Sequence, residues 1–212
     1  MSAPWFEVED SEEDGEEPWD FDSGELAFVA ALQDRAASWR VPRAHSGVGR
    51  PEDDSSLLVH VSLSDSERAM SLGDWAVHFH GTHVRAGKVV DQLFNLDPYS
   101  GRDFFRATGT VEELAERCAA WFEAVLSRPV GRLEQHGLSR AYGTTWYFAD
   151  NLEGLVGWGD PRARHDRCVL LRGATGPQEG PHSPLCPYGR ERAGRRRFRF
   201  GGRGAGLSGT GR

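Results

Sequence analysis

The amino-acid sequence predicts an α+β fold, in which an antiparallel sheet of about five to six strands carries two main helices packed on one face. Two stretches near the middle of the chain alternate apolar and polar side chains, which is typical of half-buried strands. Two further stretches place apolar side chains every three or four residues, which is typical of amphipathic helices. Short polar segments join most of these elements, so neighbouring strands should pair antiparallel within a single domain.

Residues 74–80 form the clearest predicted strand. Trp75, Val77 and Phe79 occupy alternate positions, so they share one face of the strand. Residues 57–63 show the same alternation and should pack beside the first stretch. We therefore expect the hydrophobic core to form on the face that carries the three large apolar side chains.

Weaker patterns predict the rest of the sheet. The central strand should continue to Val84, residues 85–88 should form a glycine-containing turn, and residues 89–94 should return as a strand or a short helix. Proline, glycine and polar residues predict a loop at residues 41–56 and a polar connection at residues 64–73. Further short strands are predicted at residues 104–108, 130–134 and 142–149.

Two helices are predicted from their apolar spacing and their capping residues. The first covers residues 23–39, with Ser23 as its N-cap. The second covers residues 110–127, and it begins with a capping box in which Thr110 is the N-cap and Glu113 occupies the third helical position. A proline follows each helix within three residues, which is where a helix usually has to end.

The two ends of the chain differ strongly in charge. Every charged residue in the first 25 positions is acidic, whereas residues 159–212 are rich in Gly, Arg and Pro. Such compositions bury too little apolar surface to fold, so we expect an acidic disordered leader at residues 1–22, an α+β globular domain at residues 23–158 and a disordered tail at residues 159–212. Lys88 is the sole Lys among 25 Lys and Arg residues, which suggests a GC-rich bacterial gene. A shifted reading frame in such a gene would also produce the composition of the tail.

Cysteine usage and hydropathy predict a cytoplasmic protein. The three Cys residues are widely spaced, which is not typical of a disulfide framework. The acidic leader lacks the basic and apolar regions of a signal peptide, and no stretch approaches the roughly 20 apolar residues that span a bilayer. We therefore expect no contact with membranes.

Four aromatic side chains are candidates for contact with a protein partner. Trp146 and Tyr147 are adjacent in a predicted strand, so they point to opposite faces and one of them should be exposed. Trp5 and Trp19 lie among acidic residues, a pattern that suits a segment docking on a basic, partly apolar surface. A merely solvated leader would have the same composition.

A second hypothesis concerns the basic run in the tail, which could bind nucleic acid. Arginine neutralises phosphates and phenylalanine stacks on bases, so the run resembles Arg/Gly-rich RNA-binding segments in composition. A solvated tail, or an internal partner for the acidic leader, would also explain it. The arginines at its centre are Arg195, Arg196, Arg197 and Arg199.

A third hypothesis is a metal site on the sheet. His78 and His80 project from the same face of one predicted strand, and His60 lies on the polar face of another. If the strands are neighbours, the three imidazoles could bind a divalent metal such as zinc in a metal-dependent enzyme. The alternative is a half-polar strand face that happens to carry histidine.

The sequence as a whole favours a small cytosolic binding protein without catalysis. No Gly-x-Ser-x-Gly nucleophile motif and no glycine-rich phosphate loop occurs, and no motif indicates a cofactor. The acidic surplus favours a basic protein partner, as expected for an immunity-type inhibitor of a toxin. The nucleic-acid and metal-enzyme hypotheses remain as alternatives.

Overall fold

Two helices and two antiparallel sheets, one of five strands and one of four, form the described part of this computed structural model. The structure describes residues 4–8, 19–51, 56–97, 103–136, 141–158 and 167–172. The α+β class is therefore confirmed, but the strands form two sheets where one was predicted. The two sheets belong to two compact units, Met1–Arg128 and Pro129–Arg212.

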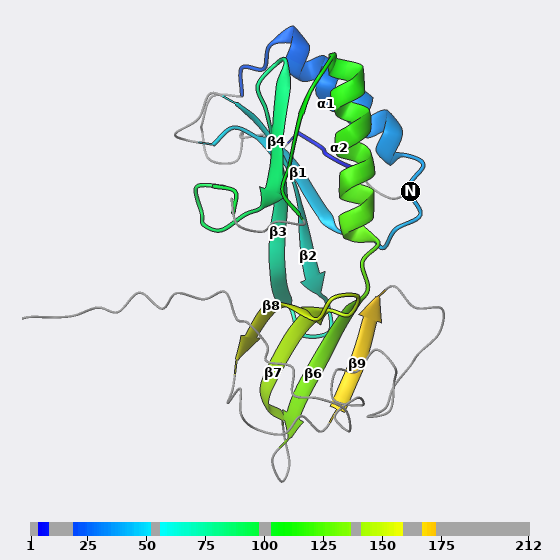
Figure 1. Ribbon diagram of the computed structural model, residues 1–212, viewed down its shortest axis with the longest axis vertical. Coiled ribbons are helices and arrows are strands. Elements are labelled where there is room, and N and C mark those ends of the chain that lie inside the picture. The colour runs from blue at the N-terminus through cyan, green and yellow to red at the C-terminus, as the bar shows by residue number, and fades with distance from the viewer. Residues whose placement is uncertain are drawn as a thin grey trace, which may run out of the picture. The chain divides into compact units, whose positions relative to one another are not determined.

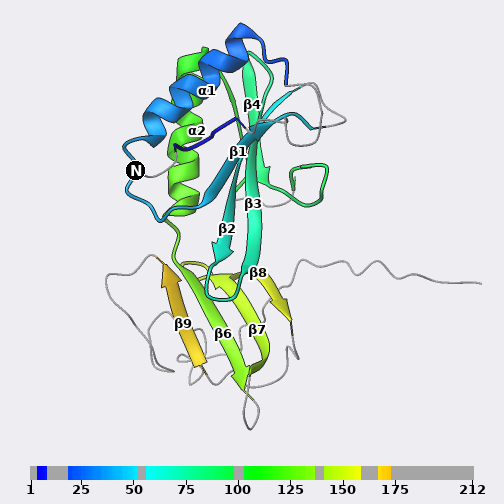
Figure 2. The same cartoon turned by 180° about the vertical axis from the view of Figure 1, so that it is seen from behind.

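The first unit contains the five-stranded sheet and both helices (Figure 1). All its strands are antiparallel and hydrogen-bonded in chain order: β1 (His45–Gly49), β2 (Leu57–Asp65), β3 (Met70–Phe79), β4 (His83–Lys88) and β5 (Phe105–Thr108). Helices α1 (Ser23–Ala36) and α2 (Val111–Leu126) lie side by side on one face of this sheet, as the views from front and back agree (Figures 1 and 2).

The core of the first unit forms on the predicted face of β3. Trp75, Val77 and Phe79 are buried, and the ring of Phe28 from α1 stacks on Phe79 with 4.3 Å between ring centroids. Burying a large apolar side chain contributes roughly 1.5–3 kcal/mol, so this face supplies much of the stability of the unit. The face opposite the helices is called the outer face below.

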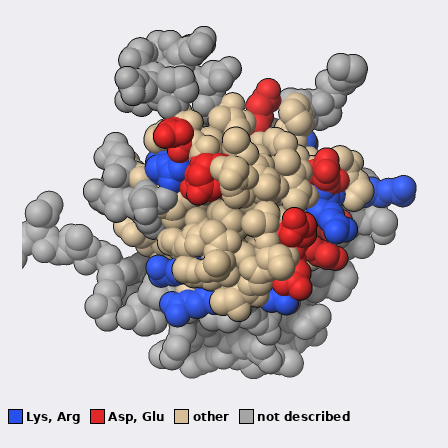
Figure 3. Space-filling model, turned by 90° about the horizontal axis from the view of Figure 1, so that it is seen from above, with Lys and Arg blue, Asp and Glu red and all other residues tan. Residues whose placement is uncertain are grey.

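Charged side chains of both signs are scattered over the described surface shown in Figure 3, around an uncharged area. No continuous acidic patch covers this view, although the chain has a formal net charge of −7. Some acidic side chains form ion pairs inside the fold. Asp103 is buried and receives the guanidinium of Arg128, with 3.1 Å between nitrogen and oxygen.

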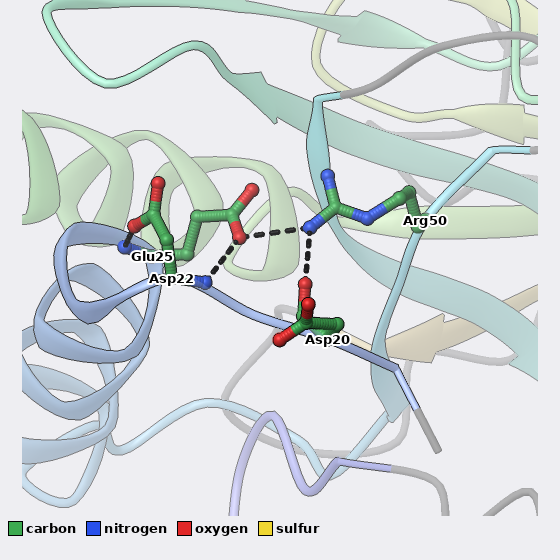
Figure 4. Close-up of polar contacts among 4 residues, drawn as sticks. All are labelled: Asp20, Asp22, Glu25 and Arg50. Atoms are coloured by element: carbon green, nitrogen blue, oxygen red, sulfur yellow. Dashed lines mark hydrogen bonds and ion pairs between the residues drawn. The ribbon is translucent and has the colours of Figure 1, made fainter. Parts of the chain in front are cut away.

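The start of α1 is held by a second internal ion pair (Figure 4). The N-cap of α1 is Asp22 and not the predicted Ser23. The Asp22 carboxylate accepts from the Glu25 backbone N–H at 2.8 Å, and the Glu25 carboxylate accepts from the Asp22 backbone N–H at 2.9 Å. Arg50, the residue after β1, donates to Glu25 at 2.8 Å and to the Asp20 carbonyl at 3.1 Å. The aspartate satisfies the helix because its carboxylate reaches the N–H three residues on.

Within residues 4–8, Trp5 and Phe6 are core residues, which corrects the prediction for this portion of the leader. Phe6 is fully buried, its N–H donates to Ser46 Oγ at 2.9 Å, and its carbonyl accepts from Gln33 Nε2 at 2.9 Å. Trp5 packs against Trp39 with 5.1 Å between ring centroids. Trp5 therefore packs in the chain's own core, because two adjacent aromatic rings bury enough area to offset the repulsion among their acidic neighbours.

Turn positions in the sheet also differ from the prediction. The chain reverses at residues 80–82, where Gly81 has φ +77°, so residues 85–88 lie within β4 and not in a turn. The glycine that suggested a turn, Gly87, serves a different purpose: a Cβ there would lie 3.1 Å from the Phe104 ring. Residues 89–94 form neither a strand nor a helix.

The structure also contains strands that the sequence patterns did not indicate. Strand β1 lies within the predicted loop at residues 41–56, and β3 begins at Met70, inside the predicted polar connection. Glycine and polar residues have low strand propensity, but hydrogen bonding to β2 holds both segments in the sheet. Helix α1 ends at Ala36, three residues before the predicted end.

The second unit is a four-stranded antiparallel sheet in the order β8-β7-β6-β9. Its strands are β6 (Val130–His136), β7 (Ala141–Phe148), β8 (Glu153–Trp158) and β9 (Arg167–Arg172). The β6–β7 hairpin was predicted, whereas β8 was not, and β9 lies in the predicted disordered tail. The remainder of that tail lies outside the described residues.

Trp146 and Tyr147 are both buried, so the prediction that one of them is exposed is wrong. They point to opposite faces of β7, and each of these faces is covered at this position. The Tyr147 ring packs with Leu133 and Cys168, and its hydroxyl lies 3.2 Å from Cys168 Sγ. The Trp146 side lies opposite Arg132, which forms a buried ion pair of 2.9 Å with Glu134.

We predict that Phe6→Ala lowers the free energy of unfolding by about 3–5 kcal/mol, because it removes a fully buried ring from the core. Chemical denaturation measures the change. Trp19→Ala is the matched control, since Trp19 is an aromatic residue of the same acidic segment with 37% of its surface exposed, and its cost should stay near 0.5 kcal/mol. Equal costs for the two variants would show that residues 4–8 are not core residues.

We also predict that Gly131→Ala destabilises the four-stranded sheet by about 1–3 kcal/mol. A Cβ at this position would overlap the ring of Tyr147, which is itself buried and cannot move aside freely. Gly49→Ala is the control, because nothing lies within 4 Å of the Cβ it would add. Guanidinium unfolding curves should separate the two variants, and identical midpoints would contradict the close approach at Gly131.

Candidate functional site

Histidines gather on the outer face of the five-stranded sheet. His60 and His78 lie on adjacent strands β2 and β3, and the antiparallel register places them on the same face, as predicted. The ring of His80 follows at 6.4 Å from His78, and His83 stacks on His80 at 4.6 Å, measured between ring centroids. His45 extends the row at 5.7 Å from His60. The turn at residues 80–82 brings His83 to this face.

Loop 89–97 covers the middle of the histidine row. The Phe94 ring lies 5.5 Å from the His60 ring, and the Phe94 carbonyl lies 3.0 Å from His78 Nε2. His78 Nδ1 lies 3.1 Å from Ser56 Oγ. Because a carbonyl only accepts, Nε2 donates to it, and Nδ1 shares a hydrogen bond with the Ser56 hydroxyl. His78 is therefore a buried connector between the sheet and the loop.

The three histidines of the metal hypothesis share a face, but the structure does not gather them into a group of metal ligands. Among the residues that the structure describes, no group of three or more His, Cys, Asp or Glu side chains is placed to hold a metal ion. Both ring nitrogens of His78 are already engaged by protein groups. The pattern on alternate positions was correct for the face, but spacing in sequence could not show that the rings line up in a row along it.

Loop 89–97 is held in one conformation by its own polar groups. The Asp91 carboxylate accepts from the backbone N–H groups of Leu93 and Asn95, each at 3.1 Å, and from the Asn95 side chain at 3.0 Å. These hydrogen bonds lower the pKa of Asp91, and the bond from the Asn95 side chain has the largest effect. The Asp91 carboxylate is therefore ionised at neutral pH. Val90 N–H donates to the Asn95 carbonyl at 2.9 Å, which closes the loop.

The same loop presents two large apolar side chains to solvent. Val90 is 57% exposed and Leu93 is 47% exposed. Phe94 points the other way, towards the sheet, and adopts a positive φ of 57° to do so. The loop thus has an inner side pinned to the sheet and an outer side with exposed apolar groups. No sequence pattern singled out this segment as a contact surface, because the hydrogen bond between its Phe94 carbonyl and His78 forms only in the tertiary structure.

The thiol of Cys118 is a chemically reactive group type, but its position in the fold is that of a core residue. Cys118 is buried on the core side of α2, and this burial raises the pKa of its thiol to about 12, so it stays protonated and unreactive at neutral pH. Among the predicted contact residues, Trp19 is partly exposed. The arginine run at residues 195–199 lies outside the described residues.

Comparison with protein-family models, with curated proteins and with solved structures found no match to this chain. Within the residues that the structure describes, no helix combines the length and apolar character needed to cross a membrane. What this protein does must therefore be inferred from its own side chains.

We predict that His78→Ala loosens loop 89–97 and lowers the free energy of unfolding by about 1–3 kcal/mol, because the Phe94 carbonyl loses its donor. Hydrogen exchange of the Val90 and Asp97 amides, which form the loop's backbone hydrogen bonds, should accelerate. His83→Ala is the control, because its ring is exposed and does not contact the loop. Unchanged exchange in His78→Ala would show that His78 does not hold the loop.

Adding zinc gives a second readout on the same variant. We expect zinc to leave the unfolding midpoint of the unmodified protein unchanged, since both nitrogens of His78 are engaged. A zinc-dependent rise in the midpoint that disappears in His78→Ala would support the metal hypothesis instead.

Proposed function

We propose that this protein is a non-catalytic protein-binding module whose contact surface is loop 89–97. The observation that carries the proposal is the exposure of Val90 and Leu93 on a loop whose backbone is fixed from within. A loop that is ordered before binding loses little conformational entropy when a partner docks, so more of the contact energy appears as affinity. When a partner covers these two side chains, apolar surface leaves contact with water, which favours binding.

The chemistry around the loop favours a basic partner with an apolar recess. Asp91 lies between the two exposed apolar side chains in sequence and carries a negative charge at neutral pH. The formal net charge of the chain, −7, adds a long-range attraction to a basic protein. An immunity-type inhibitor of a basic toxin in the bacterial cytoplasm matches this combination, and it is the specific form of the proposal.

The absence of catalysis in this proposal is supported by how the described reactive groups are used. His78 connects sheet and loop, Cys118 is a buried thiol, and Glu25 is paired with Arg50 at the start of α1. A catalytic acid, base or nucleophile has to reach a substrate, and these side chains contact protein groups instead. The nucleic-acid and metal-enzyme alternatives gain no specific support from the described residues.

The proposal predicts that Val90→Ser/Leu93→Ser weakens partner binding at least about tenfold, because it removes the apolar centre of the contact. Affinity capture from a lysate of the source organism identifies candidates, and the dissociation constant of each purified candidate is then measured at low and high salt. Binding should weaken as salt rises, since screening reduces the attraction between acidic and basic surfaces.

Leu26→Ser is the matched control, because Leu26 is an apolar residue on α1 with 52% of its surface exposed. It should leave the dissociation constant unchanged. The proposal is wrong if no purified candidate binds stoichiometrically, or if the double variant binds as tightly as the control.

A further inference from the structure

Strands β4 and β5 place two arginines directly opposite each other on the outer face. Arg85 pairs with Arg106 across the ladder, and His83 pairs with Thr108 next to them. Arg85 also lies opposite His78 of β3, which fixes the face. His83, Arg85, Arg106 and Thr108, together with Val84 and Ala107, line an open groove with a volume of about 460 Å³. The groove lies on the last two strands of the sheet.

The charges of this groove are not balanced within the described residues. Like charges that face each other on adjacent strands destabilise a sheet, so a fold tolerates them only at a cost. In contrast, Arg50 forms an ion pair with Glu25 at 2.8 Å, and Arg128 forms one with Asp103 at 3.1 Å. Within the described part of the chain, Arg85 and Arg106 have no carboxylate at ion-pair distance, and the Arg106 guanidinium instead stacks over Phe104 at 5.1 Å.

We propose that this groove binds the phosphate group of a small phosphorylated molecule. Two guanidinium groups carry two positive charges and present planar pairs of N–H donors, which match the oxygens of a phosphate. A phosphate monoester carries about −1.5 to −2 at pH 7, so it neutralises both arginines, whereas one carboxylate neutralises only one. His83 and the Thr108 hydroxyl lie beside the arginines and can donate to the remaining oxygens.

The groove is open to solvent, so it suits contact with a phosphate group rather than enclosure of a whole ligand. His83 lines the groove and stacks on His80 with 4.6 Å between ring centroids, so the other face of the His83 ring is available to the unphosphorylated part of such a ligand. The groove involves none of the side chains of loop 89–97, so this site is independent of the proposed protein contact.

The test is a titration of the full chain with inorganic phosphate and with phenyl phosphate at low salt, followed by backbone amide NMR. The amides of residues 83–85 and 106–108 should shift saturably, and site-resolved shifts separate this groove from the other arginines of the chain. Arg85→Gln and Arg106→Gln should each raise the dissociation constant at least about tenfold, since each loses a charge-assisted pair of hydrogen bonds.

Arg35→Gln is the matched control, because Arg35 is an exposed arginine of α1, and it should leave phosphate binding unchanged. In phosphate-free buffer, Arg85→Gln should unfold at the same midpoint as the unmodified protein or slightly above it, since one of two facing charges is gone. Phosphate should raise the midpoint of the unmodified protein and not that of Arg85→Gln.

Three outcomes would overturn the inference. If the amide shifts do not saturate, or if Arg35→Gln weakens phosphate binding as much as Arg85→Gln does, the groove is not a phosphate site. Acetate binding as tightly as phosphate would assign it to a carboxylate. A single-stranded oligonucleotide that binds the same residues far more tightly than phenyl phosphate would assign it to a nucleic-acid backbone. Val90→Ser/Leu93→Ser should bind phosphate normally, which keeps this test separate from that of the protein contact.

Discussion

The central position of β3 is the constraint on which the first unit depends. The strand pairs with β2 along one edge and with β4 along the other, so both of its edges are hydrogen-bonded. On one face Trp75, Val77 and Phe79 pack beneath the helices, and on the other His78 is held by loop 89–97. A strand covered on both sides cannot shift its register without exposing one set of side chains and burying the wrong one. The hydrogen bond between His78 and the Phe94 carbonyl of the loop depends on this register.

The charged side chains of this fold fall into two groups, those paired with an opposite charge inside the protein and those without one nearby. Several acidic side chains are consumed in internal pairs, among them Glu25 with Arg50 and Asp103 with Arg128, and these pairs join segments that lie far apart in the sequence. Net charge therefore says little about which surface binds a partner. The groups to consider are those with no opposite charge nearby, because their electrostatic energy is still available to a ligand.

Local patterns were sufficient where a segment's own residues decide its structure. Alternation on β3 and the capping box at Thr110 and Glu113 were predicted correctly, because side-chain direction and hydrogen bonds within four residues determine them. Local patterns failed where contact with a distant segment determines the structure. Strand β1 has weak propensity and is a strand because β2 offers backbone groups to it. Strand β9 contains four consecutive apolar residues, but the Gly, Arg and Pro around it hid this signal, and it pairs with β6. The aromatic residues at positions 5 and 6 are core because Trp39 and Phe122 surround them.

The candidate site shows the same division. The sequence by itself determined the α+β class, the apolar face of β3 and the placement of His60 and His78 on one side of the sheet, since alternation and the need to bury apolar surface act along a single strand. Only the tertiary structure decided that His78 connects a loop and that Arg85 faces Arg106. These juxtapositions depend on strand register and on the path of the chain between strands, and neither is encoded in the spacing of residues along one strand.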